Sequence, residues 1–313
     1  MDYLLPFITF APLVGALLIL FVPKDDERTI KNLAVGISAV PLLLAIYLWF
    51  AYDKAASGFQ FEVLAEWIPD INVNFHMAAD GLSIPLIFLT ALLTTLCMIY
   101  SSFAITKRVK EFFFLFFLLQ MGMFGVFVSL DLVLFYVFWE IGLVPMYLLI
   151  GIWGQAKDRP QYSAIKFFLY TLSGSVLMLL AILGLYFFHG TFDIVALSEG
   201  LGVDGPMGPL FDGNTVLAMA AFWAFFIAFA IKVPLWPFHT WLPDAHTAAP
   251  TAGSVILAGV LLKLGGFGML RSLLPVFPEQ FSFYSWNVPV ILILALFSII
   301  YGALGCMAQW DLK

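Results

Sequence analysis

Three ionisable residues interrupt long apolar stretches of the chain, where a charge is costly and therefore informative. They are Glu140, Lys232 and Lys263. A charged side chain at the centre of a bilayer costs about 2.5–3.5 kcal/mol on insertion scales. Such a residue needs a partner, a hydrated cavity or a function, and a carboxylate beside an amine can exchange a proton. These three residues are therefore the candidate proton-translocating groups.

Glu140 and Lys263 are predicted to lie at a similar depth. Each is about eleven residues from the inner end of its apolar stretch, which places it about 17 Å into a core of about 30 Å. The structural interpretation is a fixed ion pair, or a lysine whose side chain extends to the membrane surface. The functional interpretation is a protonation site, because a small change in separation alters the balance between the charged and neutral forms.

Lys232 precedes a stretch that cannot continue as a regular helix. Residues 234–243 contain three prolines, and a straight helix over 214–248 would be about 50 Å long, too long for one crossing. Because proline removes a backbone donor and clashes with the preceding turn, the helix must break. A break at membrane depth is tolerated only inside protein or beside a hydrated cavity, and discontinuous helices are typical of proton sites in transporters. The alternative places Lys232 at an ordinary helix end near the surface.

Other polar residues accompany the predicted break. His239 and His246 flank Asp244 and are candidates for a proton relay, with structural hydrogen bonding as the alternative. A metal site is not expected, since the prolines remove a regular ligand face and no further ligand is nearby. Lys166 is either an anchor at the membrane interface or a participant in proton uptake.

Composition excludes several classes of protein. Of 313 residues, 63% are hydrophobic and 11% charged, whereas soluble domains have about 25% charged residues. The net charge of −6 argues against a nucleic-acid partner. Gly200, Gly202 and Gly205 match a dinucleotide-binding pattern, but no strand precedes them, so that interpretation fails. Cys97 and Cys306 are too few for an iron–sulfur cluster or a zinc site and are expected to be packing residues. No cofactor is expected on this chain.

The apolar stretches predict an all-α membrane protein with nine spans. They cover residues 3–22, 31–51, 82–104, 112–130, 132–153, 164–188, 214–233, 252–274 and 288–308, the seventh continuing irregularly to about residue 248. Continuous apolar blocks of this length favour helices over barrel strands. Within the fourth span, the phenylalanine-rich stretch 112–117 is interpreted as lipid-facing packing.

Basic residues in the loops predict the orientation. With the N-terminus outside, ten lie on the inner side and two on the outer side, which is a clear positive-inside bias. The inner set is Lys24, Arg28, Lys31, Lys107, Arg108, Lys110, Lys157, Arg159, Lys166 and Lys313, and the outer set is Lys54 and Arg271. Asp131 is expected in an outer turn, and His76 and His189 in outer loops.

Four segments, in this order, resemble the antiporter-like membrane subunits of respiratory complex I, the NADH:quinone oxidoreductases. They are residues 139–151, 232–246, 249–255 and 261–265. The resemblance covers essentially the whole chain and is greater to the bacterial respiratory form than to the plastid form. It therefore implies a multi-pass protein of a bacterial inner (plasma) membrane.

The resemblance also implies an architecture and a role. The family has two inverted five-helix repeats, each with one discontinuous helix, so residues 1–110 would hold three leading helices, 111–275 the first repeat and 276–313 the start of the second. Glu140, Lys232 and Lys263 would form a central polar axis that changes protonation as quinone is reduced elsewhere. NADH, flavin, iron–sulfur clusters and quinone would belong to partner subunits of the membrane-bound complex.

Two alternatives accompany this interpretation. The chain could be the large subunit of a multisubunit Na⁺/H⁺ antiporter, or it could have a purely structural role in a membrane assembly. Because members of the family continue beyond the position of Lys313, we expect the chain to be a fragment of a longer protein.

Overall fold

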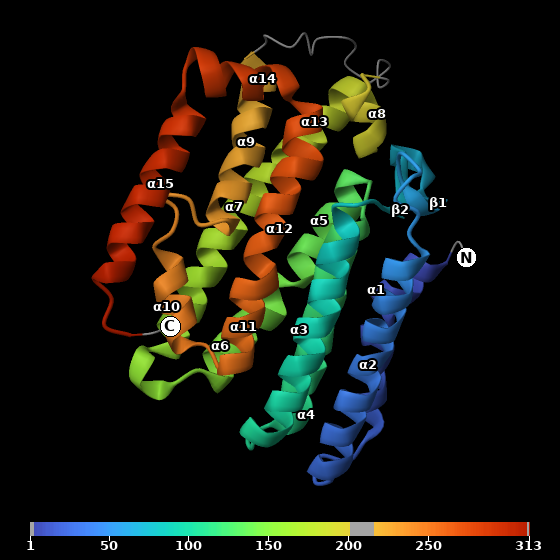
Figure 1. Ribbon diagram of the computed structural model, residues 1–313, viewed down its shortest axis with the longest axis vertical. Helices are drawn as coiled ribbons and strands as arrows, with labels where there is room; N and C mark the ends of the chain where they lie inside the picture. The colour runs from blue at the N-terminus through green and yellow to red at the C-terminus, as the bar shows by residue number, and fades with distance from the viewer. Residues whose placement is uncertain (1–2, 201–215, 312) are drawn as a thin grey trace.

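The computed structural model describes residues 3–200, 216–311 and 313, and they form a bundle of long helices lying side by side (Figure 1). The long helices are α1 (Leu4–Phe21), α2 (Glu27–Ala51), α3 (Ser83–Ala104), α4 (Val109–Val128), α5 (Leu132–Ile141), α6 (Leu143–Trp153), α7 (Pro160–His189), α9 (Val216–Lys232) and α15 (Val290–Met307). The short ones are α8 (Ile194–Ser198), α10 (Trp241–Ala248), α11 (Thr251–Ile256), α12 (Leu262–Gly268), α13 (Leu274–Val276) and α14 (Pro278–Ser282). The predicted helical membrane fold is confirmed.

Most of the predicted spans appear as single helical stretches. Within the described residues, eight stretches are long and apolar enough to cross a membrane, and α9 is a shorter ninth. The span predicted at 132–153 consists of α5 and α6, which meet at Gly142. The span predicted at 252–274 contains two π-helical segments, η3 (Leu257–Leu261) and η4 (Met269–Leu273). Of the three glycines that match the dinucleotide-binding pattern, Gly202 and Gly205 lie outside the described residues.

A two-stranded antiparallel hairpin connects α2 to α3. Its strands are β1 (Gln60–Ile68) and β2 (Val73–Ala79), joined by a turn in which Asn72 adopts a left-handed conformation. The sequence predicts an outer loop here, because strands of nine and seven residues are too short for a membrane span and are interrupted by polar residues. We call this end of the bundle, which also carries α8 and α14, the hairpin face, and the opposite end the basic face (Figure 1).

Helix α4 lies in the middle of the bundle, and its phenylalanines do not face lipid. Phe112, Phe113, Phe116 and Phe117 are fully buried, and α4 packs against α1, α3, α5 and α6. The prediction of lipid-facing packing at 112–117 is therefore wrong. When a helix is apolar on every side, its sequence does not show whether lipid or other helices surround it.

Helix α5 approaches α4 closely because α4 carries glycine at the contact. A Cβ atom at Gly125 would lie 2.0 Å from the Phe138 ring, and one at Gly122 would lie 2.9 Å from the backbone nitrogen of Gly142. A larger residue at either position would push α5 outward. This contact fixes the last turn of α5, which carries Glu140.

Candidate functional site

The helix that begins at Val216 is discontinuous. Helix α9 ends at Lys232 and α10 begins at Trp241, and the eight residues between them are not helical. The predicted break is confirmed. Side chains supply partners for backbone groups that the break frees: the Trp241 Nε1 donates to the Ile231 carbonyl at 2.9 Å, and the Ser298 Oγ accepts from the Trp236 amide at 3.0 Å. Such compensation is what an irregular backbone at membrane depth requires.

The structure brings Glu140 and Lys232 into one region. Lys232 is 2% exposed, and its Nζ lies 5.1 Å from the centre of the Trp139 ring, next to Glu140 in the last turn of α5. Glu140 and Lys232 interact electrostatically, but no direct ion pair joins them in the part of the chain that the structure describes. The Glu140 Oε1 is buried without a hydrogen-bond partner. The Glu140 carboxylate also has a hydrogen bond with the Ser175 side chain, and the residue is only partly buried. Among the described residues, neither Glu140 nor Lys232 has its charge balanced by a direct ion pair with the other.

Lys263 does not lie in the same buried region as Lys232. Its side chain is exposed, and its Nζ donates to the Ala258 carbonyl at 2.6 Å. Its helix nevertheless touches Lys232, because a Cβ atom at Gly265 would lie 3.0 Å from the Lys232 Cβ. The structure therefore joins two of the three predicted residues, and it places the third on the helix packed against them.

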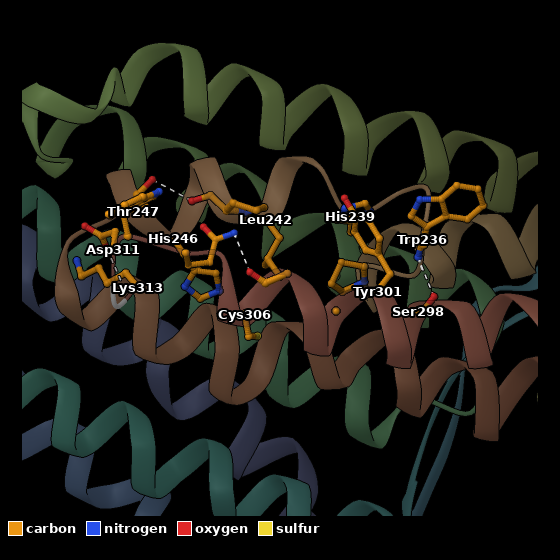
Figure 2. Close-up of a pocket in the computed structure, with 16 residues that line it drawn as sticks. Trp236, His239, Leu242, His246, Thr247, Ser298, Tyr301, Cys306, Asp311 and Lys313 are labelled. Atoms are coloured by element: carbon orange, nitrogen blue, oxygen red, sulfur yellow. Dashed lines mark hydrogen bonds between the residues drawn. The ribbon is translucent and has the colours of Figure 1, made fainter.

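A cavity of about 610 Å³ lies beside the break, between α10 and α15 (Figure 2). His239 and His246 both line it, so the two candidate relay residues share one space. The His239 ring lies 5.2 Å from the Tyr301 ring, and its Nδ1 is buried without a hydrogen-bond partner. Cys306 is exposed and lines the same cavity, whereas Cys97 is buried and donates to the Ala252 carbonyl. The expectation of a packing role therefore fits Cys97 and does not fit Cys306.

Lys166 forms an ion pair with Asp244, the residue between the two histidines. The Lys166 Nζ lies 2.6 Å from the Asp244 Oδ2, and the contact ties α7 to α10. Asp244 is thus engaged by a cation. Over residues 3–200 and 216–311, no three His, Cys, Asp or Glu side chains are grouped so that they could hold a metal ion.

The hairpin face contains a histidine held by two carboxylates. The His76 Nδ1 lies 2.5 Å from the Asp193 Oδ2, and its Nε2 lies 2.9 Å from the Glu62 Oε1. Because ionised carboxylates only accept hydrogen bonds, this geometry favours the imidazolium form, in which both ring nitrogens donate. Burial alone would lower the pKa of His76, but its hydrogen bonds and charge interactions with Asp193 and Glu62 outweigh burial and raise the pKa above 6.5. The sequence placed His76 in an outer loop; it is a buried strand residue.

A second ion pair fastens the end of the hairpin to the bundle. The Arg271 Nη2 lies 2.6 Å from the Asp80 Oδ1 and 3.3 Å from the Ser83 Oγ. Burial alone would raise the pKa of Asp80, but Arg271 and Ser83 hold it below its usual value. Arg271 was predicted in an outer loop, and it lies instead in the π-helical segment η4. No spacing signal in the sequence joins residues 191 positions apart.

Asp131 lies in the turn between α4 and α5, as predicted, but it is fully buried. It caps α5 by accepting from the amides of Val133 and Leu134, and it also accepts from the Asn74 amide at 3.1 Å. Burial raises the pKa of Asp131 despite these hydrogen bonds, and the neighbouring charge of Asp193 raises it further. The hairpin is therefore anchored to the start of the helix that carries Glu140.

The sequence of this chain is similar to those of known membrane proteins. Residues 129–313 match the family model described as NADH:quinone oxidoreductase/Mrp antiporter, TM. The NADH-quinone oxidoreductase subunit M of Rhodobacter capsulatus is 44% identical over 100% of this chain and 61% of the relative. That of Rickettsia prowazekii is 42% identical over 97% of this chain and 60% of the relative, and the NADH-ubiquinone oxidoreductase chain 4 of Chondrus crispus is 40% identical over 97% and 59%.

Solved structures agree with these relatives. A chain of respiratory complex I from Thermus thermophilus with bound NADH superposes with a TM-score of 0.82 at 29% identity, over 98% of this chain and 60% of that chain. A chain of the archaeal membrane-bound sulfane sulfur reductase, at 22% identity and a TM-score of 0.70 over 86% of this chain and 40% of that chain, shares the fold alone. The chain spans about 60% of the length of the curated relatives it matches.

The helical bundle, the break after Lys232 and the partly buried Glu140 thus occur in a multi-pass membrane chain whose relatives match it along nearly its whole length. The chain belongs to the NADH:quinone oxidoreductase/Mrp antiporter family of membrane subunits.

Proposed function

We propose that this chain is part of a proton-translocating membrane subunit of an NADH:quinone oxidoreductase, in which protons pass by way of Glu140 and Lys232. The observation that carries the proposal is that the buried Lys232 and the partly buried Glu140 interact beside a broken helix, with no direct ion pair between them among the described residues. A structural ion pair would be expected to close to hydrogen-bond distance, because that geometry offsets the cost of removing two charges from water. Two charges held apart can instead change protonation.

The chemistry of the step follows from the geometry. Lys232 is the last residue of α9, and the C-terminal end of a helix favours a positive charge. When Glu140 is ionised, it stabilises the ammonium further; when Glu140 takes up a proton, that stabilisation is lost and the amine releases its proton more readily. Protonation of one group thus drives deprotonation of the other.

Other polar residues near Glu140 and Lys232 are placed to deliver protons to this pair and to accept protons from it. We propose that His239 and His246 relay protons through the cavity beside the break, which both of them line. Lys166, paired with Asp244 near the basic face, would take part in proton uptake. Lys263 would accept the proton next, since its helix packs directly against Lys232 at Gly265.

The redox chemistry would belong to other subunits. We propose that NADH, flavin, iron–sulfur clusters and quinone are bound by partners, and that this chain binds other membrane-arm subunits and carries protons. The bacterial relatives support a bacterial plasma membrane, and the excess of basic residues at one end supports an external N-terminus. The first 110 residues, 111–275 and 276–313 would then be the leading helices, the first repeat and the start of the second.

A multisubunit Na⁺/H⁺ antiporter is the second candidate, because the matching family includes such antiporters. The relatives that match nearly the whole chain carry NADH oxidoreductase names, which favours the first candidate. The neighbouring genes discriminate between the two. Genes for NADH-oxidising and iron–sulfur subunits would support the oxidoreductase, and genes for small antiporter subunits would support the antiporter.

The direct test replaces Glu140 with Gln in the full-length protein and measures quinone-coupled proton pumping by the assembled complex. We expect pumping to be lost while the amount of assembled complex is unchanged, because Gln keeps the shape and cannot release a proton. Glu111→Gln is the matched control, since Glu111 lies on the basic face, 3.8 Å from Arg108, and away from the break. Unchanged pumping with Glu140→Gln would leave the chain a structural role only.

A further inference from the structure

The buried Lys232 ammonium lies over an aromatic ring. The Lys232 Nζ lies 5.1 Å from the centre of the Trp139 indole, and the two residues are 2% and 3% exposed. An ammonium within about 6 Å of a ring centre is attracted to the negative face of the ring, and tryptophan is the strongest of the aromatic partners. The attraction is larger when both groups are desolvated, as they are here.

The indole is fixed in this position by rings from two helices. Its centre lies 5.6 Å from the Phe135 ring, one turn earlier on α5, and 5.6 Å from the Phe229 ring on α9. Both phenylalanines are fully buried. Phe229 is three residues before Lys232, so α9 supplies both the charge and one wall of the slot that holds the indole.

We propose that Trp139 is a positioning residue for proton translocation, whose indole face holds the charged Lys232 side chain beside the helix break. The proposal deepens the proposed function and rests on it. The ring attracts the ammonium and has no comparable attraction for the neutral amine, so it favours the charged form without itself exchanging a proton.

The position of Trp139 couples two influences on Lys232. Trp139 and Glu140 are consecutive residues in the last turn of α5, which ends at Ile141. A displacement of this turn therefore changes the distance of both the indole and the carboxylate from the ammonium. If the turn moves away, the attraction of the ammonium to the indole and its attraction to the carboxylate both weaken. Proton release from Lys232 therefore responds more strongly to the movement than it would if only the carboxylate were attached to the turn.

The test compares three variants of the full-length protein in the assembled complex: Trp139→Leu, Trp139→Phe and Phe135→Leu. Trp139→Leu should move the alkaline limb of the pH profile of quinone-coupled pumping to lower pH by about one unit, a tenfold effect at a given pH on that limb. Trp139→Phe, which keeps a ring face, should show a smaller shift in the same direction. Phe135→Leu removes one of the rings that hold the indole but keeps the indole itself, so it should shift the profile less than Trp139→Leu does.

A structural role for Trp139 would show the opposite pattern. Equal profiles for the wild type, Trp139→Leu and Phe135→Leu would overturn the proposal, as would equal shifts for Trp139→Leu and Phe135→Leu. A double variant that combines Trp139→Leu with Lys232→Met provides an internal check, in which the residual quinone reductase activity is measured. If the indole acts through Lys232, adding Trp139→Leu should not change that activity in a chain that already carries Lys232→Met.

A spectroscopic measurement separates this proposal from the proposed function and does not need Trp139→Leu to assemble. The ultraviolet resonance Raman spectrum of tryptophan should differ between the wild type and Lys232→Met, and the difference should vanish when both carry Trp139→Phe. Absence of the difference would overturn the contact. Normal pumping by both Glu140→Gln and Lys232→Met would instead overturn the proposed function, whatever the Raman spectra show.

Discussion

Two groups of buried charges in this molecule are arranged in opposite ways. On the hairpin face, His76 and Arg271 each lie within 2.5–2.9 Å of a carboxylate oxygen. Beside the helix break, Glu140 and Lys232 interact without a direct ion pair among the described residues, and the ammonium lies over the Trp139 indole ring. The direct contacts of the first arrangement favour the charged form of each group, whereas the second arrangement has no such ion pair to hold either charge.

Access to water accounts for part of the difference. Two of the three ion pairs on the hairpin face have a partner that reaches solvent, since the side chains of Glu62 and Asp80 are 53% and 26% exposed; in the third pair, His76 and Asp193 are 7% and 16% exposed. A partly hydrated pair pays a smaller desolvation penalty and can close to contact at little cost. Lys232 has no such access, so a change of protonation there is a large change in free energy that a protein can couple to movement.

The largest expected effect is on stability and separates the two groups directly. Arg271→Met leaves Asp80 charged and without its partner, and we expect a loss of about 3 kcal/mol in the free energy of unfolding. Lys232→Met removes a cation that has no close ionic partner, and Glu140 can then take up a proton, so we expect no loss and a gain of about 1 kcal/mol. Thermal unfolding of the two full-length variants in lipid nanodiscs measures both, and equal losses would remove the distinction.

The second prediction concerns Lys263. Lys263→Ala should lower quinone-coupled pumping at least tenfold, which corresponds to about 1.4 kcal/mol. Lys263→Arg should not restore turnover, because arginine holds its proton too tightly to release it. Pumping by the assembled complex is the measurement. Normal turnover with Arg would show that position 263 supplies a fixed charge and belongs with the hairpin-face group.

The third prediction is a pH dependence confined to His76. The pKa of His76 is raised above 6.5, so the stability that it contributes is fully present below about pH 6.5 and is lost as the pH rises through the folded value. Burial alone would raise the pKa of Asp193, but His76 and backbone amides lower it below 3.8, so its contribution is lost only as the pH falls below about 4. The contact should therefore be strongest between about pH 4 and 6.5.

Hydrogen exchange of the β2 amides, corrected for the intrinsic rate, tests this window. We expect protection to fall about fivefold above the folded pKa, equivalent to about 1 kcal/mol. The amides near Asp80 serve as the control, because Arg271 keeps its charge at every accessible pH. Protection of β2 that is unchanged from pH 5 to 9 would contradict the assignment of His76 as an imidazolium.

The smallest expected effect is at the ion pair of Lys166 with Asp244. The two side chains are 22% and 41% exposed, and exposed pairs contribute about 0.2–1 kcal/mol. Lys166→Met should therefore change the unfolding midpoint by less than any variant above. A fall in pumping without a change in stability would support the uptake role of Lys166, and a loss of stability comparable with that of Arg271→Met would show that the pair is mainly structural.

Several features follow from the sequence because their causes are local. Each apolar stretch is long enough to predict one membrane span. The three prolines of 234–243 break the helix regardless of how the rest of the chain packs. The presence of Glu140 and Lys232 inside such stretches identified them as unusual before any contact was known. Short strands of nine and seven residues give no comparable signal, and the sequence did not predict the hairpin.

Other features depend on contacts between residues far apart in the chain, and only the tertiary structure decides them. An apolar helix gives no sign of its surroundings, so the burial of α4 followed from the helices packed around it. His76 meets Asp193 across 117 positions, and Arg271 meets Asp80 across 191. The sequence determined which charges are costly, because hydrophobicity and proline act locally; packing determined which of them are paired, because an ion pair requires two side chains to meet in space.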